Sequence, residues 1–259
     1  MNYPTTLLRR PPLLLIGLLL ILSPCSLSAM QFKALVFSDK SDKWHHPNVP
    51  VARESFEALA RKHFFELTWV ETAEAFSDQE FAAYDVIVFI SASPCGLDDD
   101  KRKEFQAYVA GGGGVVGVHF SFAFEDAERQ WPWWEELVGN VFVCHPPQQS
   151  GIMTNEAPDF PACLHLPEKW LWTDEWYTFK LPFREDLNVV LTVDEDSYYP
   201  RPQDVMGEFH PIAWYHEPGG GRLFYTSLGH ITESYRDPLF LQHIYGGMLW
   251  AVGERDPKW

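Results

Sequence analysis

A run of four glycines, followed at once by an apolar segment and a histidine, occupies residues 111–119 (GGGGVVGVH). Glycine adopts turn conformations at no steric cost, so this run predicts a sharp turn at the end of a helix. The valines then predict a short buried strand that ends at His119. In open α/β sheets, ligands bind beyond the carboxyl ends of the strands, which makes His119 a candidate site residue. The pattern fits equally well a capped helix that leads into a core strand, with an inert, hydrogen-bonded histidine.

The segments before this run alternate between strand-like and helix-like patterns. Residues 85–90 (DVIVFI) form an apolar run that is typical of a strand buried on both faces of a parallel sheet. We expect further strands at residues 32–37, 64–70 and 115–118, with helices after Asn48, at residues 76–81 and after the aspartates 98–100. This alternation predicts an α/β fold with a doubly wound, mostly parallel sheet flanked by helices.

The second half of the chain is less regular. We expect, in order, a short helix between Pro132 and Gly139, a strand at residues 187–193, an added C-terminal hairpin of residues 211–216 and 222–228, and a last helix from Asp237 to Trp250. The sequence contains no internal repeat, low-complexity tract or linker. Residues 30–259 are therefore predicted to form a single domain.

The N-terminal residues 1–29 resemble a secretory signal peptide. Arg9 and Arg10 precede an apolar run at residues 13–22, and small residues follow at 26–29. The apolar run is too short for a comfortable membrane span. We expect cleavage near residue 29, export to the periplasm or the extracellular space, and no membrane span in the mature chain.

Net charge and motif spacing argue against a nucleic-acid partner and a nucleotide cofactor, and the cysteine count limits the number of disulfides. The formal net charge of −16 at pH 7 repels phosphate backbones, so no nucleic-acid partner is expected. The glycine run has neither the Lys-Ser/Thr of a P-loop nor the spacing of a dinucleotide fingerprint, so no nucleotide is expected. Only Cys95, Cys144 and Cys163 follow the predicted leader, which permits at most one disulfide.

Four histidines, His46, His119, His145 and His230, follow predicted strand ends. If these ends share one edge of the sheet, the histidines converge there with the adjacent carboxylates of residues 174–175. Such a cluster suits either a divalent metal ion or acid/base chemistry near neutral pH. Because no H-E-x-x-H spacing or cysteine pair is present, the metal interpretation depends on this convergence alone.

Nucleophilic catalysis is a weaker interpretation of the same sequence. Ser121 lies close to His119 in sequence, but it is not part of a G-x-S-x-G elbow. Adjacent side chains on a strand point to opposite faces, so Cys144 and His145 form a poor dyad. Clustered tryptophans at residues 131–134 and 170–176 suit the C–H faces of sugar rings, although a large aromatic core explains them as well.

Several sequence blocks together resemble the ThuA-like family, the trehalose-utilisation domain. In chain order these blocks are Trp44-His45-His46, residues 84–90 (YDVIVFI), residues 111–119, residues 131–139 with His145-Pro146, residues 174–179 (DEWYTF) and residues 210–230 (HPIAWYHEPGGGRLFYTSLGH). The resemblance spans residues 32–252. It implies a flavodoxin-like, class I glutamine amidotransferase-like fold and a role with trehalose or related disaccharides.

The chain departs from this family at His45, and it differs from the glutaminase relatives, as its family does, at His119. His45 stands where the family often has arginine, so a cation is not assured at that position. His119 stands where the glutaminase relatives have their nucleophilic cysteine, so glutamine hydrolysis is not expected.

These features together predict an exported carbohydrate-processing protein that acts on a disaccharide or an oxidised (keto) sugar, as a hydrolase, lyase or isomerase. The expected catalytic residues are His46, His119, His230 and Glu175, with Glu175 as the acid/base carboxylate. The expected substrate-binding residues are Tyr177, Arg222, Trp44 and His145. Two alternatives remain open: a non-catalytic sugar-binding module, and a metal-dependent hydrolase with the four histidines as candidate ligands.

Overall fold

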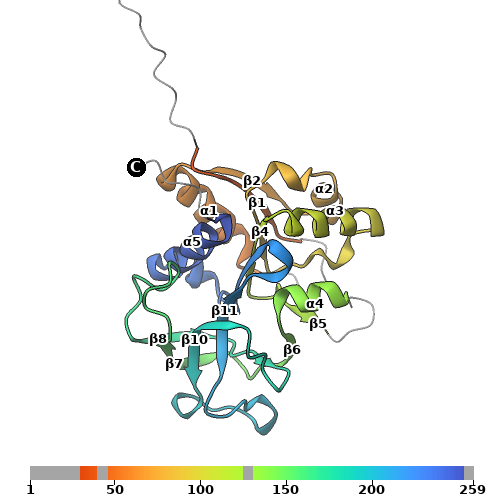
Figure 1. Cartoon of the computed structure of the whole chain (residues 1–259). Helices are drawn as coiled ribbons and strands as arrows, with labels where there is room; N and C mark the ends of the chain where they lie inside the picture. Colours follow the sequence, from red (N-terminus) through yellow and green to blue (C-terminus); the bar gives the residue numbers. More distant parts are fainter. Residues whose placement is uncertain (1–29, 40–45, 125–130, 254–259) are drawn as a thin grey trace, which may run out of the picture.

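Five parallel strands form one half of a nine-stranded sheet (Figure 1). The computed structural model describes residues 30–39, 46–124 and 131–253. Across this half the order is β2 (Glu66–Val70), β1 (Lys33–Phe37), β3 (Val86–Ile90), β4 (Gly114–Val118) and β12 (Arg222–Thr226). Each neighbouring pair is parallel. The predicted α/β fold with a mostly parallel sheet is therefore confirmed.

Four further strands extend the sheet beyond β12 with antiparallel pairing. They are β11 (Pro211–His216), β10 (Asn188–Asp194), β7 (Gln149–Asn155) and β8 (Lys169–Asp174). Only β11 and β7 run against the direction of the other strands in this sheet. The predicted hairpin forms as β11 and β12, but it is not an addition at the edge, because β12 pairs with β4 in the middle of the sheet.

A second, smaller sheet lies beside the first. It has the order β5 (Ala123–Phe124), β6 (Val141–Cys144) and β9 (Thr178–Phe179). The β9 strand follows β8 after only a few residues, so the segment between them connects the two sheets. Within the described ranges, no helix has the length and apolar character that a membrane span requires.

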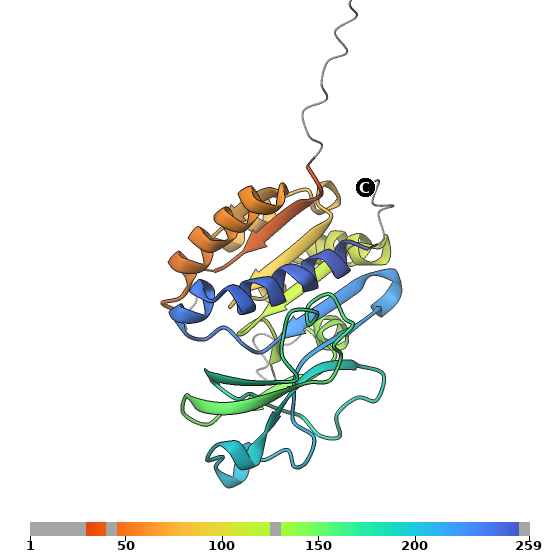
Figure 2. The same ribbon diagram turned by 90° about the vertical axis from the view of Figure 1, so that its left-hand side faces the viewer.

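Helices cover both faces of the large sheet. One face carries α1 (Val49–His63) and α5 (Pro238–Val252), which Figure 2 shows lying on the same side of the strands. The other face carries α2 (Ala73–Ser77), α3 (Asp99–Ala110) and α4 (Pro132–Val138). The helix predicted at residues 76–81 is wrong in its bounds. It begins earlier because the side chain of Thr72 accepts the backbone N–H of Ala75 and caps the helix there.

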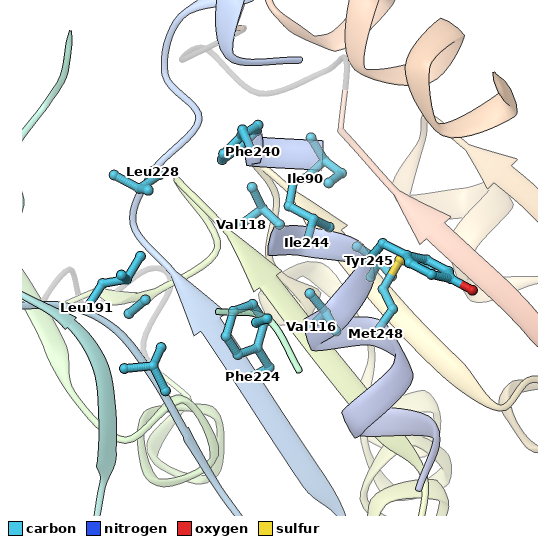
Figure 3. Packing of buried hydrophobic residues seen from close by; sticks show 14 of the residues in the cluster. Ile90, Val116, Val118, Leu191, Phe224, Leu228, Phe240, Ile244, Tyr245 and Met248 are labelled. Atoms are coloured by element: carbon cyan, nitrogen blue, oxygen red, sulfur yellow. The ribbon is translucent and has the colours of Figure 1, made fainter. Parts of the chain in front are cut away.

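The strand β4 lies in the middle of the hydrophobic core. Its side chains alternate between faces, so Val116 and Val118 pack toward α5 while Val115 packs on the opposite side. Figure 3 shows Val116 and Val118 beside Ile244 and Met248 of α5. All of these side chains are fully buried. Burial on both faces explains why the strand is continuously apolar.

The glycine run has two structural requirements. Gly112 has a φ of +96°, which completes the predicted turn out of α3. At Gly114, a Cβ would lie 2.4 Å from the carbonyl oxygen of Ala251, so α5 approaches β4 too closely for any side chain. The run thus fixes both the turn and the packing distance of the strand that delivers His119.

Candidate functional site

Histidines from three separate segments converge at the carboxyl-terminal edge of the parallel strands. His119 directly follows β4, His230 follows β12, and His46 precedes α1. One nitrogen atom of each ring lies within 4.8 Å of the corresponding atoms of the other two. The sequence predicted a convergence of four histidines on the condition that the strand ends share one edge of the sheet. The structure brings three of them this close, and the parallel pairing of β4 with β12 places His119 and His230 at the same edge.

The backbone of His119 adopts a left-handed conformation, with a φ of +57°. Such a conformation is unfavourable for a residue with a side chain, and it persists only where the surroundings hold it. Here the His119 N–H donates to Thr226, and the hydroxyl of Tyr225 donates to the His119 carbonyl at 2.9 Å. The strand end is therefore built as an elbow that projects this side chain into the cluster.

The ring of His119 is fully buried and has an unambiguous tautomer. Its Nδ1 lies 3.0 Å from the carbonyl oxygen of Ser227, so Nδ1 must carry the proton and donate it. The lone pair on Nε2 accordingly faces the cluster. There it accepts the hydroxyl of Tyr177 at 2.8 Å and lies 3.2 Å from Nδ1 of His230.

Glu175 places a carboxylate against these rings. Its Oε2 lies 3.2 Å from Nδ1 of His230 and 3.8 Å from Nε2 of His119. Burial, together with the adjacent charge of Asp174, raises the pKa of Glu175 to about 7. A carboxyl group with such a pKa exchanges protons near neutral pH.

The imidazoles of His119 and His230 are held in their neutral forms. Burial lowers the pKa of His119 well below its ordinary value, and the neighbouring His46 and His230 lower it further. Burial also lowers the pKa of His230, with a smaller effect from His145. Burial raises the pKa of Tyr177 well above its ordinary value, so its hydroxyl keeps its proton. Neutral rings present lone pairs rather than positive charge.

Asp174 is a positioning residue that the sequence grouped with Glu175 without separating their roles. It is fully buried, and its carboxylate accepts the backbone N–H groups of Gly229, His230 and Glu175. The indole N–H of Trp172 donates to it as well. Asp174 therefore fixes the loop of His230 to the strand end that carries Glu175.

The side chain of Asn48 also hydrogen-bonds to the loop that carries His230. Asn48 directly precedes α1, as the sequence predicted, but its side chain makes no capping hydrogen bond to the helix. Its amide instead donates to the carbonyls of Gly229 at 2.5 Å and His230 at 3.1 Å. The long sequence separation of these partners hid this contact from pattern analysis.

Of the predicted binding residues, the structure places Tyr177 and His145 at the site and Arg222 away from it. Tyr177 lies in the cluster, and His145 lies at its margin, where its Nδ1 is 3.7 Å from Glu175 and 2.9 Å from the carbonyl of Pro146. Arg222 lies at the amino end of β12, opposite the cluster, and pairs with Glu217 at 3.6 Å. The structure thus does not bring Arg222 to this site. Trp44 lies outside the described residues.

The tryptophans of residues 131–134 and 170–176 pack in or against the core. Trp131, Trp134, Trp170, Trp172 and Trp176 are buried, and Trp133 is half-buried against the same core. The large aromatic core, which was the other interpretation, accounts for them. Sequence density alone did not separate the two because both interpretations require the same residues.

Within the described residues, neither nucleophile candidate donates to its neighbouring histidine. The Ser121 hydroxyl is buried and donates to the carbonyls of Phe89 and Val118 rather than to His119. The Cys144 thiol donates toward Asp204, and burial raises its pKa. A raised thiol pKa disfavours the thiolate that nucleophilic attack needs.

Comparisons with known proteins agree with this architecture. A ThuA-like protein from Bacteroides uniformis ATCC 8492 is 26% identical with a TM-score of 0.74, covering 86% of this chain and 92% of its own. A ThuA-like protein from Parabacteroides merdae ATCC 43184 is 18% identical with a TM-score of 0.66. The match covers 85% of this chain and 89% of that protein. A cytoplasmic protein from Salmonella typhimurium is 13% identical with a TM-score of 0.57. The match covers 84% of this chain and 98% of that protein.

The similarities to the proteins from Parabacteroides merdae and Salmonella typhimurium show the fold alone, because their identities of 18% and 13% are low. No curated protein sequence matches the chain significantly. The family model described as "Trehalose utilisation" matches residues 33–251, which is nearly all of the described chain. The chain therefore belongs to the ThuA family, as the sequence resemblance indicated.

Proposed function

We propose that this chain is an exported enzyme that processes a disaccharide or a keto sugar at the cluster of His46, His119, His230 and Glu175. The family's association with trehalose utilisation supports the class of substrate. The observation that carries the proposal of catalysis is the position of Glu175, whose Oε2 faces two imidazole nitrogens at 3.2 and 3.8 Å.

Proton transfer is the chemistry that this arrangement supports. Sugar reactions need a proton to leave a hydroxyl or a C–H next to a carbonyl, and a proton to reach the leaving or carbonyl oxygen. Glu175 receives or returns that proton. His230, which lies within hydrogen-bonding distance of Glu175, is the partner that shares it. The Tyr177 hydroxyl provides a donor that stays protonated.

Turnover of a sugar panel tests this proposal. The untagged mature protein is incubated with trehalose, other disaccharides and their keto derivatives, and products are identified by mass spectrometry. We expect Glu175→Gln to reduce turnover at least about a hundredfold, since general acid/base groups contribute on that scale. Glu217→Gln is the matched control, because this exposed carboxylate lies beside Arg222 at the other end of β12.

Two outcomes contradict the proposal. Full activity in Glu175→Gln removes the acid/base role of this carboxylate. Saturable sugar binding by calorimetry, with no product from any member of the panel, identifies a sugar-binding module instead of an enzyme. Export is tested separately by N-terminal sequencing of the mature protein, which we expect to begin near residue 30.

A further inference from the structure

We propose that His46, His119 and His230 bind a divalent transition-metal ion, for which zinc is the best match. The inference deepens the proposed function by giving the same site a cofactor, and its catalytic meaning rests on that function. Imidazole nitrogens are ligands that suit zinc and related ions. Three protein ligands with one position left open is the arrangement of a catalytic zinc site.

The spacing of the ring nitrogens fits such an ion. A tetrahedral zinc ion with nitrogen ligands at about 2.0–2.1 Å separates two of these ligands by roughly 3.3 Å. Nε2 of His119 lies 3.2 Å from Nδ1 of His230. The His46 ring lies against both, with ring centroids 5.0 Å from His119 and 5.8 Å from His230. A small movement of His46 completes the set, since all three ligand atoms already lie within 4.8 Å.

The surroundings of His119 are those of a metal ligand. Its Nδ1–H donates to the Ser227 carbonyl, which fixes the tautomer and leaves Nε2 available. Metal-binding histidines generally donate their other ring N–H to a carbonyl or carboxylate in this way. The elbow at His119 and the hydrogen bonds from the His230 loop to Asp174 hold two of the ligands on rigid strand ends.

The open position of the ion faces Glu175. This carboxylate balances the charge of the cation and lies where it can take a proton from a bound oxygen. The Tyr177 hydroxyl hydrogen-bonds Nε2 of His119 in the metal-free arrangement, and Glu175 is a second acceptor within its reach. An ion on Nε2 of His119 and Nδ1 of His230 would leave the Tyr177 hydroxyl to donate to Glu175 and the ring proton of His230 on its Nε2. An oxygen bound to the ion, rather than His230, would then share the proton of Glu175. His145, the fourth candidate, stays outside the ligand set because its Nδ1 faces the Pro146 carbonyl.

Metal content measured without sugar tests the inference. Untagged protein is analysed by elemental mass spectrometry as purified, and again after chelator treatment and reloading with Zn²⁺. We expect one equivalent in the wild type, and at least a tenfold loss of Zn²⁺ affinity in His46→Gln and in His230→Gln. His63→Gln is the matched control, since His63 stacks on Tyr245 at the far end of α1. Circular dichroism shows that each variant is folded.

The possible results separate this inference from the proposed function. Less than one equivalent of Zn²⁺ in the folded wild type, or unchanged affinity in folded His46→Gln and His230→Gln, overturns the metal site. Sugar turnover by metal-free protein overturns the catalytic role of the ion and leaves the proposed function standing. A protein that binds Zn²⁺ as expected and turns over no sugar supports the metal site and contradicts the proposed function.

Discussion

At the scale of single residues, the site depends on buried polar groups that hold backbone as well as on the groups that face substrate. His119 and Glu175 are the groups at the centre. Asp174, Asn48 and the Ser227 carbonyl hold them, each through hydrogen bonds to segments distant in sequence. The sequence predicted His119 because it follows a strand end, and Glu175 because a carboxylate beside converging histidines suits acid/base chemistry. The sequence could not predict the hydrogen bonds that hold these groups in place, because tertiary packing determines which segments they join.

Asp174→Asn tests this holding role. The amide keeps the size of the side chain but turns one acceptor oxygen into a donor that faces backbone N–H groups. Because hydrogen bonds to a buried charge are strong, we expect the free energy of unfolding to fall by about 2 kcal/mol or more. Urea denaturation measures this change. Asp196→Asn, at an exposed carboxylate, should stay within about 0.5 kcal/mol, and equal effects of the two variants would contradict the role of Asp174.

At the scale of elements, the pairing of β4 with β12 assembles the site and the pairing of β4 with α5 stabilises it. Continuous apolar runs made β3 and β4 predictable as buried parallel strands. The strands β7 and β8 were not predicted, because β7 (QSGIMTN) has few apolar residues and β8 was interpreted as part of a tryptophan cluster. Strand order was also beyond the sequence. The position of Arg222 was not, because Arg222 begins the strand whose other end leads to His230.

Gly114→Ala tests the close approach of α5 to β4. An added Cβ would lie 2.4 Å from the Ala251 carbonyl oxygen, so the helix or the strand has to move. We expect a loss of about 1–3 kcal/mol in the free energy of unfolding, the usual effect of overpacking. Gly96→Ala is the matched control, since its nearest neighbour, the Cβ of Ala73, lies 3.9 Å away. Thermal unfolding of both variants measures the difference, and an unchanged Gly114→Ala protein would contradict this packing argument.

At the scale of the whole molecule, stability should depend on pH through a histidine outside the site. His243 is fully buried in α5, where its Nδ1–H donates to the Ala162 carbonyl. Burial, with a smaller effect from the nearby His165, lowers its pKa to about 4. The unfolded chain therefore takes up this proton below about pH 6.5, while the folded protein takes it up only near pH 4. The stabilising contribution is complete above pH 6.5 and is lost as the pH falls toward 4.

His243→Gln removes this titration and keeps an amide that can donate to the same carbonyl. We expect the stability of the wild type relative to the variant to decrease by about 3 kcal/mol between pH 7 and pH 4, which follows from the shift in pKa. Urea denaturation of both proteins across this range measures the difference. A difference in the free energy of unfolding that stays constant from pH 7 to pH 4 would show that the pKa of His243 is the same in the folded and unfolded chain.

The most direct measurement on the whole molecule is turnover of the disaccharide and keto-sugar panel by the wild type and by Glu175→Gln, with Glu217→Gln beside them. We expect product from the wild type and from Glu217→Gln, and at least about a hundredfold less from Glu175→Gln. Equal turnover by all three proteins would contradict the central claim that Glu175 and the histidine cluster form the catalytic site.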